Sequence, residues 1–273
     1  MRSSASRRRT ILRAMTLPYV EIDGRPADAE NLLVPALTGG YGHFTAMQVR
    51  DGRVRGLAHH LTRLDRATRE LFGPGLDGER IRSLTRQALE ACGRSDAAVR
   101  VYVYGPADAP TPMVVVNEPV DMPSTAQSLL SVPYERPVAH LKHLGGFAQG
   151  YYVRLAERQG FTEALLTGPG GVVAEGAITN VAFWDGGSVV WPNRPALLGI
   201  TMAVLEPRLA AYGLKSAHRE VTLAGLDTYS AAFIMNSRGI APVGRIDERE
   251  FAVDAELMKV VWRAYEEAPW DVI

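Results

Sequence analysis

The chain has 273 residues and a mass of 29.7 kDa, enough for one large domain or two smaller ones that each bury a core. Thirty basic and thirty acidic residues cancel to a formal net charge of zero, so the basic excess typical of nucleic-acid-binding proteins is missing. Hydrophobic residues make up 47% of the chain, yet no apolar run approaches the roughly 18 residues of a membrane span. We expect a globular protein that neither binds nucleic acid nor crosses a membrane.

The cysteine content and the N-terminal residues bear on the compartment. Cys92 is the single cysteine and has no partner for an intramolecular disulfide, which favours a reducing environment. We therefore expect a cytoplasmic protein in which Cys92 packs as a small hydrophobe. Residues 1–16 are rich in arginine, and neither a long apolar segment nor a cleavage site follows them. We expect them to form a flexible basic tail.

Residues 17–120 show strand and helix patterns in turn. Alternating or β-branched runs predict strands, and Asp51 with Gly52 is a strong hairpin signal between two of them. Apolar residues at helical spacing, closed by glycine, predict helices. The strands are expected over residues 17–22, 43–50, 53–57, 99–104 and 113–116, and the helices over residues 58–72 and 79–92. This part should form a smaller N-terminal α+β domain.

An interdomain linker is expected over residues 121–128, in a stretch that contains Pro119 and Pro123 and lacks periodicity. Beyond it, short apolar runs are separated by glycine-rich turns and helical patterns. Strands are expected over residues 129–132, 163–167, 172–174, 180–184 and 188–191, and helices over residues 150–159, 201–212 and 254–267. Residues 129–273 should therefore form a larger C-terminal domain.

Three separated segments carry residues suited to chemistry, and the first contains His60 and Arg63. A spacing of three places both side chains on one face at the start of the first predicted helix. By itself, this segment is also what an ordinary helix with a solvated arginine looks like.

The second segment contains Lys142, in a mostly apolar context with two histidines. Burial there would lower the pKa of the lysine and leave a neutral amine that can form a Schiff base. Glu175 follows at the end of a predicted strand, beside a glycine that allows close approach of a ligand to the backbone. A single lysine is otherwise most often a surface residue.

The third segment ends in Gly199, Ile200 and Thr201 and leads directly into a predicted helix. Thr201 is expected to cap this helix, whose free N-terminal amides and dipole would suit a phosphate. An ordinary capped helix is the alternative interpretation. Pro207 lies inside the predicted helix and should kink it.

The order of these motifs resembles that of the class IV, or fold type IV, pyridoxal-phosphate-dependent aminotransferases. The shared pattern is His-Leu-x-Arg-Leu at residues 60–64, then Lys142, Glu-Gly-x-x-x-Asn from Glu175, and Leu-x-Gly-Ile-Thr ending at Thr201. The family includes branched-chain and D-amino-acid aminotransferases and aminodeoxychorismate lyase. The resemblance covers residues 17–246 and implies a two-domain fold, with a smaller N-terminal α/β sandwich domain and a larger domain built on a pseudo-barrel of strands.

The resemblance also implies roles for individual residues. Lys142 would bind pyridoxal 5'-phosphate as a Schiff base and then shuttle a proton between the substrate and the cofactor. Glu175 would pair with the pyridine nitrogen and keep it protonated. The phosphate would be bound by Arg63, Ile200, Thr201 and Ser237. No metal is implied.

Three positions depart from the family pattern. Thr45 and Gln48 stand where many members have a glutamate and an arginine, and Phe147 stands where many have a tyrosine that meets the cofactor's phenolic oxygen. Loss of the arginine removes a bidentate carboxylate partner, so substrate identity and stereochemical preference stay open. Candidate substrate-binding residues are His43, Arg100, Tyr102 and Tyr104, each with an ordinary strand or loop role as its alternative.

The leading functional prediction is transfer of an amino group between an amino acid or amine and a 2-oxo acid. Elimination of the aminodeoxychorismate-lyase type is the second prediction, and a non-catalytic family member that binds a small metabolite is the third. The resemblance further implies a homodimer. The aromatic residues Phe44, Tyr102 and Tyr104 are expected either at that interface or within the N-terminal domain.

Overall fold

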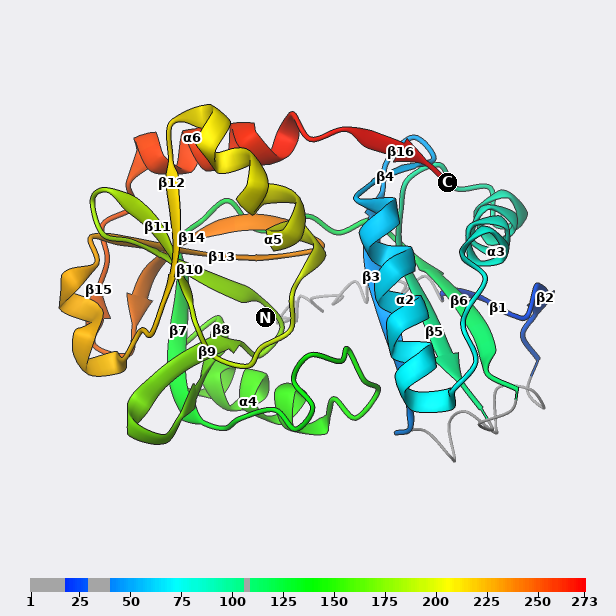
Figure 1. Cartoon of the computed structure of the whole chain (residues 1–273), viewed down its shortest axis with the longest axis horizontal. Helices are drawn as coiled ribbons and strands as arrows, with labels where there is room; N and C mark the ends of the chain where they lie inside the picture. Colours follow the sequence, from blue (N-terminus) through cyan, green and yellow to red (C-terminus); the bar gives the residue numbers. More distant parts are fainter. Residues whose placement is uncertain (1–17, 29–39, 106–108) are drawn as a thin grey trace, which may run out of the picture.

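The computed structural model describes residues 18–28, 40–105 and 109–273, so the tail predicted over residues 1–16 lies outside the described residues. The described strands form one five-stranded sheet, one nine-stranded sheet that curls, and a short two-stranded ribbon, with helices packed against the two larger sheets (Figure 1). This mixed architecture confirms the predicted α+β fold class and the pseudo-barrel of strands.

The five-stranded sheet is antiparallel and has the strand order β2-β1-β6-β5-β3. Its strands are β1 (Tyr19–Ile22), β2 (Arg25–Pro26), β3 (Gly42–Val49), β5 (Ala97–Tyr104) and β6 (Thr111–Asn117). Helices α2 (Leu57–Phe72) and α3 (Gly78–Ala91) share a hydrophobic core with these strands (Figure 1). Both helices and all the strands predicted for this part are present, with ends shifted by one to a few residues.

The alternation of β5 decides which of its side chains face the helices. Val99, Val101 and Val103 are buried in the core, whereas Arg100 is exposed and Tyr102 is partly exposed on the opposite face. The same period of two in β3 turns its odd-numbered residues to the core. The sheet therefore has one face packed on helices and one face free to border a site.

The nine-stranded sheet has the order β12-β11-β10-β13-β14-β7-β8-β9, with β15 (Arg249–Glu250) added to β14. Its other strands are β7 (Gln127–Pro133), β8 (Glu163–Gly168), β9 (Val172–Gly176), β10 (Asn180–Trp184), β11 (Ser188–Pro192), β12 (Lys215–Arg219), β13 (Ala231–Asn236) and β14 (Gly239–Ile246). The amide of Val173 donates to the carbonyl of Val221 at 2.8 Å, just after β12. This contact draws the two ends of the sheet together, which curls it into a half-barrel.

Helix α4 (Phe147–Arg158) covers β7 and β8, while α5 (Ile200–Leu205) and α6 (Ala255–Glu266) pack on the strands around β13 (Figure 1). The prediction of a helix over residues 201–212 is wrong in two respects. The α-helix begins at Ile200, with Gly199 as its N-cap, so Thr201 lies in the first turn and does not cap it. It also ends at Leu205, where a 3-10 segment, η2 (Glu206–Tyr212), starts because Pro207 has no amide hydrogen to continue the helix.

Six strands were not predicted: β2, β12, β13, β14, β15 and β16 (Trp270–Val272). Strand β16 pairs with β4 (Arg53–Arg55) in the two-stranded ribbon, so the C-terminal segment crosses from α6 to the side of the first sheet, where Ile273 joins its core (Figure 1). Residues 118–126 make the other visible passage between the sheets, from β6 to β7. The linker predicted over residues 121–128 overlaps this passage, although its last two residues already belong to β7, and we propose it as the connection between two domains.

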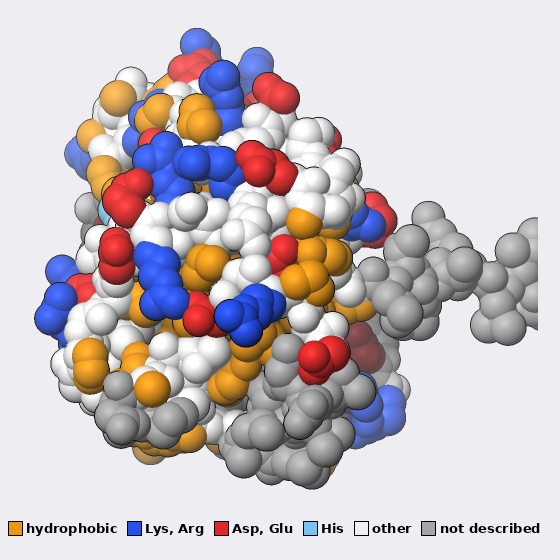
Figure 2. Space-filling view, turned by 90° about the vertical axis from the view of Figure 1, so that its right-hand side faces the viewer, with side chains coloured by type: hydrophobic (Ala, Val, Ile, Leu, Met, Phe, Trp, Pro, Cys, Tyr) orange, Lys and Arg blue, Asp and Glu red, His pale blue; other side chains and the backbone are white. Residues whose placement is uncertain are grey.

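The surface carries charges of both signs. On the face in Figure 2, lysine and arginine side chains lie among aspartate and glutamate side chains, with apolar patches between them. Within the described ranges, none of the helices has the length and apolar character needed to span a membrane.

Candidate functional site

A cavity of about 430 Å³ lies between the two sheets. The free face of the first sheet contributes Phe44, Arg100 and Tyr102 to its wall, and the second sheet contributes Glu175 from the end of β9. The predicted residues that border this cavity are Arg63, Arg100, Tyr102, Lys142, Glu175, Ile200 and Ser237. Residues from six separate segments of the sequence therefore meet in one place.

Lys142 lies in an irregular segment between β7 and α4 that is attached to the edge of β3. The amide of Phe44 donates to the carbonyl of Lys142, and the amide of Leu144 donates to the carbonyl of Gly42, both at 2.9 Å. The Nζ of Lys142 lies 4.8 Å from the centre of the Phe44 ring. Burial, helped by the nearby guanidiniums of Arg63 and Arg136, lowers the pKa of Lys142 to about 7. A large fraction of this amine is therefore neutral and nucleophilic near neutral pH.

Glu175 is held by an ion pair that the sequence did not suggest. The Nη1 of Arg136 lies 2.9 Å from Oε1 of Glu175, and the amide of Leu197 donates to Oε2 at 3.2 Å. Burial raises the pKa of Glu175, and the guanidinium of Arg136 opposes that shift. Glu175 is therefore a fixed carboxylate on the cavity wall.

Arg136 also fixes the segment that carries the lysine. Its guanidinium donates to the carbonyl of Ala139 at 3.0 Å and to the carbonyl of Leu141 at 2.7 Å. Arg136 lies in a stretch without periodicity between a strand and a turn, so no sequence pattern singled it out. One arginine thus positions both Glu175 and the backbone next to Lys142.

The first turn of α5 forms another part of the wall. A Cβ atom at Gly199 would lie 2.0 Å from Oδ1 of Asn180, so a larger residue would require the Asn180 side chain to move. The Nδ2 of Asn180 in turn donates to the carbonyl of Leu197 at 2.7 Å. The hydroxyl of Thr201 is buried and donates to the carbonyl of Asn236 at 2.7 Å, which ties α5 to the end of β13 beside Ser237.

A second cavity, of about 280 Å³, lies on the other side of this turn. It shares Ile200, Ser237 and Arg238 with the larger cavity and is also bordered by His60 and Thr201. The predicted phosphate-binding residues therefore lie at the boundary between the two cavities, with Arg63 on one side and Thr201 on the other.

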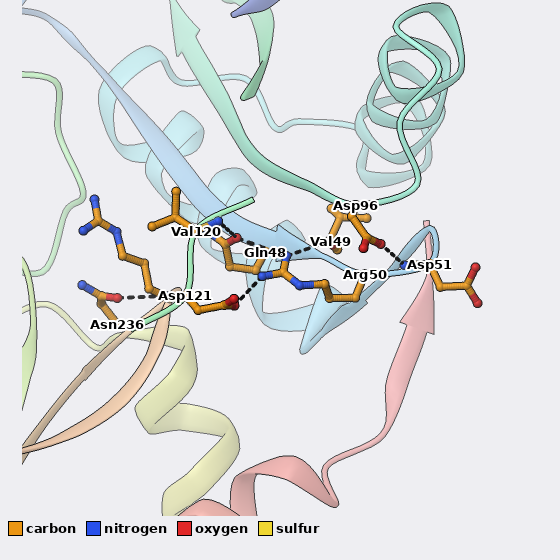
Figure 3. A network of polar contacts seen from close by, with 9 residues as sticks. Gln48, Val49, Arg50, Asp51, Asp96, Val120, Asp121 and Asn236 are labelled. Atoms are coloured by element: carbon orange, nitrogen blue, oxygen red, sulfur yellow. Dashed lines mark hydrogen bonds and ion pairs between the residues drawn. The ribbon is translucent and has the colours of Figure 1, made fainter. Parts of the chain in front are cut away.

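Arg50 and Gln48 border the second cavity and belong to a polar network (Figure 3). The Oε1 of Gln48 accepts hydrogen bonds from Nη1 of Arg50 at 3.2 Å and from the amide of Val120 at 3.0 Å. Arg50 also forms an ion pair of 2.5 Å with Asp121. Gln48, one of the departures from the family pattern, thus binds the segment of residues 118–126 between the two sheets to β3.

Other predicted residues lie away from the larger cavity. His43 is buried with its Nε2 2.9 Å from Oγ1 of Thr68, so it lies between β3 and α2. Tyr104 is partly exposed at the end of β5. Phe147 is 86% exposed and stacks on Tyr151, so the side chain at the family's tyrosine position points to solvent.

The residues present fit a phosphorylated aldehyde cofactor. Lys142 supplies a neutral amine and Glu175 supplies a fixed carboxylate. Arg63 supplies a buried guanidinium whose Nε has no hydrogen-bond partner in the described structure, and burial lowers its pKa only to about 10. It therefore stays cationic at neutral pH and suits an anion.

Comparisons with known proteins agree with this architecture. The sequence model of the family described as Amino-transferase class IV matches residues 42–246. A hypothetical aminotransferase from Mycobacterium tuberculosis in its PLP-bound form is 24% identical, with a TM-score of 0.75 over 86% of this chain and 90% of that chain. A comparison with curated proteins found no significant match.

Two further solved structures share the fold. A branched-chain aminotransferase from Thermoproteus uzoniensis with norvaline is 20% identical, with a TM-score of 0.80 over 91% of this chain and 93% of that chain. A putative 4-amino-4-deoxychorismate lyase from Legionella pneumophila is 17% identical, with a TM-score of 0.77 over 85% of this chain and 93% of that chain. The chain is thus similar in fold to aminotransferases and to a putative lyase.

Proposed function

Because the chain belongs to the class IV aminotransferase family, we propose that it is a pyridoxal-phosphate enzyme that transfers an amino group from an amino acid or amine to a 2-oxo acid. The observation that carries this proposal is the Lys142 amine of lowered pKa in one cavity with Glu175 and Arg63. When bound, pyridoxal 5'-phosphate supplies an electrophilic carbon for amines and a ring that accepts electrons.

Lys142 is the residue that bonds the cofactor and moves protons. Its neutral Nζ would be the group that holds the cofactor's aldehyde carbon, by condensation with loss of water, and the free amine would be the base that moves the proton of the substrate's Cα. The attachment of its backbone to β3 holds the amine over Phe44. The same amine therefore serves as nucleophile and as base.

Glu175 holds a proton on the pyridine nitrogen. A carboxylate favours the cationic ring, whereas a neutral group at this place would not. The ion pair with Arg136 fixes the direction of the carboxylate and opposes the rise in its pKa that burial causes. Arg136 is thus a positioning residue for Glu175.

The phosphate end is bound by residues from three elements. Arg63 of α2 provides the charge, the first turn of α5 provides the amides of Ile200 and Thr201, and Ser237 after β13 provides a hydroxyl. These groups would hold the phosphate of the cofactor in the cavity that Lys142 also borders.

The substrate end is bordered by the free face of the first sheet. Arg100 is exposed on that face, where its Nη1 lies 3.3 Å from the hydroxyl of Tyr102, and Tyr102 stacks on Phe44 with 5.3 Å between ring centres. A guanidinium beside a phenol suits a substrate carboxylate. We propose Arg100 and Tyr102 as the residues that bind it.

The assembly is proposed to be a homodimer. Several apolar side chains around the cavity are exposed in one chain, and such exposed surface often marks an interface: Phe147, Tyr151, Ile178 and Leu198. Two domains, residues 17–120 and 129–273, and a cytoplasmic location remain part of the proposal. Light scattering that found a fully active monomer of 29.7 kDa would exclude sites shared between two chains.

A purified holoprotein tests the proposal directly. We expect visible absorption that borohydride abolishes, and mass spectrometry should then find the pyridoxyl group on Lys142. The other lysines are Lys215 and Lys259, so Lys142→Ala should lose the label and Lys215→Ala should keep it. A label on Lys215 or Lys259 would refute the assignment, and a colourless protein would favour the non-catalytic alternative.

A single-turnover assay separates transfer from elimination, since both use the same lysine. With an amino donor and no oxo acid, a transaminase releases one equivalent of 2-oxo acid per site and stops. A lyase of the aminodeoxychorismate type continues to release pyruvate from its substrate. The structural similarity to the Legionella protein makes the second outcome the alternative to test.

A further inference from the structure

The hydroxyl of Thr45 joins two residues of the phosphate region. Its Oγ1 accepts a hydrogen bond from Nη2 of Arg63 and lies 2.6 Å from Nδ1 of His60. Thr45 and His60 are both buried. Thr45 occupies the position where many family members have a glutamate, so this link is particular to a chain with a hydroxyl there.

The contacts of Thr45 favour one tautomer of His60. A guanidinium only donates, so the Thr45 oxygen accepts from Arg63. If Nδ1 of His60 donated to this oxygen as well, the Thr45 hydrogen would have no acceptor among the contacts of the described residues. Donation from Thr45 to an unprotonated Nδ1 satisfies all three groups and places the imidazole proton on Nε2.

His60 is also neutral. Burial and the neighbouring guanidinium of Arg63 hold the pKa of His60 well below its usual value. The Nε2–H group is consequently a neutral donor at physiological pH, with no acceptor capacity of its own.

The fold places His60 beside the first turn of α5. Gly56 precedes α2 with φ 72°, and a Cβ atom there would lie 2.8 Å from Val204 and 3.1 Å from Ile200 of α5. Glycine thus allows the start of α2 to touch α5. One turn later, His60 borders the second cavity together with Thr201 and Ser237.

From these contacts we propose that His60, held by Thr45 as the neutral Nε2–H tautomer, is a further phosphate-binding residue of this site. The inference rests on the proposed function, since it places the cofactor's phosphate between Arg63 and the first turn of α5. Thr45 acts through the other two residues and is a positioning residue.

The charges of the three residues support an anion in this place. Thr45 and His60 are neutral, so neither cancels the positive charge of Arg63. A carboxylate at position 45 would form an ion pair with that arginine. The Thr45 hydroxyl instead orients the charged donor Arg63 and the neutral donor His60, and the positive charge of Arg63 stays available to a phosphate.

The first test reads the tautomer in the apoprotein by long-range proton–nitrogen NMR near neutral pH. His60→Gln identifies the signals by their loss. We expect a neutral ring with the proton on Nε2, and a shift of that proton when inorganic phosphate is added. A proton on Nδ1, a charged ring, or no response to saturating phosphate would overturn the proposal.

The second test compares the affinity of the apoprotein for inorganic phosphate and for pyridoxal phosphate. Thr45→Val removes the hydroxyl at almost constant volume and should weaken both affinities about tenfold, the effect of losing a hydrogen bond to a charged group. Thr45→Ser restores the hydroxyl and should restore binding.

A matched control lies in the same domain. Thr68 also contacts a buried histidine: its Oγ1 lies 2.9 Å from Nε2 of His43 while its hydroxyl donates to the carbonyl of Leu64, and neither Thr68 nor His43 borders either cavity. Thr68→Val should leave phosphate affinity unchanged. Equal weakening in both valine variants would show a general packing effect and refute the proposal for Thr45.

The two proposals fail in distinguishable ways. Phosphate titration does not involve Lys142, so a protein that binds phosphate through His60 but takes up no cofactor on Lys142 would refute only the enzymatic function. A protein that takes up cofactor on Lys142, with unchanged phosphate affinity in Thr45→Val and His60→Gln, would refute only the role of His60.

Discussion

The guanidinium of Arg136 and the carboxylate of Glu175 form an ion pair of 2.9 Å whose side chains are 5% and 7% exposed. Removing one member of such a pair leaves an uncompensated buried charge. We expect Arg136→Met to lower the free energy of unfolding by about 3–5 kcal/mol, the usual cost of breaking a buried pair. Urea denaturation of the apoprotein measures this free energy.

Arg194 provides the control, since its ion pair with Glu135 is exposed to solvent. Arg194→Met should change stability by about 1 kcal/mol or less. If Arg136→Met lowered the free energy of unfolding no more than Arg194→Met does, Arg136 would not be holding Glu175 and the segment that carries Lys142.

Glu175→Gln should keep the fold and the cofactor but slow the removal of the substrate's Cα proton. A neutral amide cannot hold the ring nitrogen protonated, and losing a charged hydrogen bond of about 1.5–3 kcal/mol corresponds to a slowing of about 10- to 150-fold. Stopped-flow absorption with an α-deuterated amino donor measures this step. An unchanged rate would contradict the role given to Glu175.

Lys142 should make cofactor uptake depend on pH. Its pKa is lowered to about 7, and only the neutral amine attacks the aldehyde, so the rate of uptake should rise with pH through about 7 and then level off. A lysine at its ordinary value of 10.5 would keep gaining rate well above pH 8. Uptake is followed by absorption after mixing apoprotein with pyridoxal phosphate.

The same pKa predicts a change in stability. Between about 7 and 10.5 the unfolded chain holds a proton on Lys142 that the folded chain has released, so stability should rise with pH across this range. Lys142→Met lacks the titrating group, and the difference between the two proteins should therefore shrink as pH increases. A difference that stays constant from neutral to alkaline pH would contradict the lowered pKa.

Gly199→Ala should disturb the site through Asn180. The new Cβ would lie 2.0 Å from Oδ1 of Asn180, so that side chain must move and release the carbonyl of Leu197. We expect a loss of about 1–3 kcal/mol in stability, typical of overpacking, together with weaker cofactor binding. Thermal unfolding with and without cofactor measures both.

Gly187→Ala is the matched control for this glycine. A Cβ there would approach no atom closer than 3.7 Å, so stability and cofactor affinity should stay near those of the original protein. Wild-type behaviour of Gly199→Ala would mean that the turn before α5 tolerates a side chain.

The sequence by itself determined the local elements and the chemical inventory. Helices α2, α3 and α6 were predicted because their apolar residues repeat at helical spacing and have clear stop or cap signals. Lys142, Glu175 and Arg63 were singled out by the order of their motifs. Strands β13 and β14 were missed, since buried strands have no alternating pattern and look like other apolar runs.

Only the tertiary structure decided how these residues meet. The ion pair of Arg136 with Glu175 joins positions on different elements, and neither residue's neighbours encode it. The contacts of Thr45 are also a result of the fold. In the sequence this residue only departs from the family's glutamate, but in the structure its hydroxyl contacts both His60 and Arg63. Periodicity reports which face of an element is buried, whereas partners across elements depend on how the sheets and helices pack, and that is a property of the whole chain.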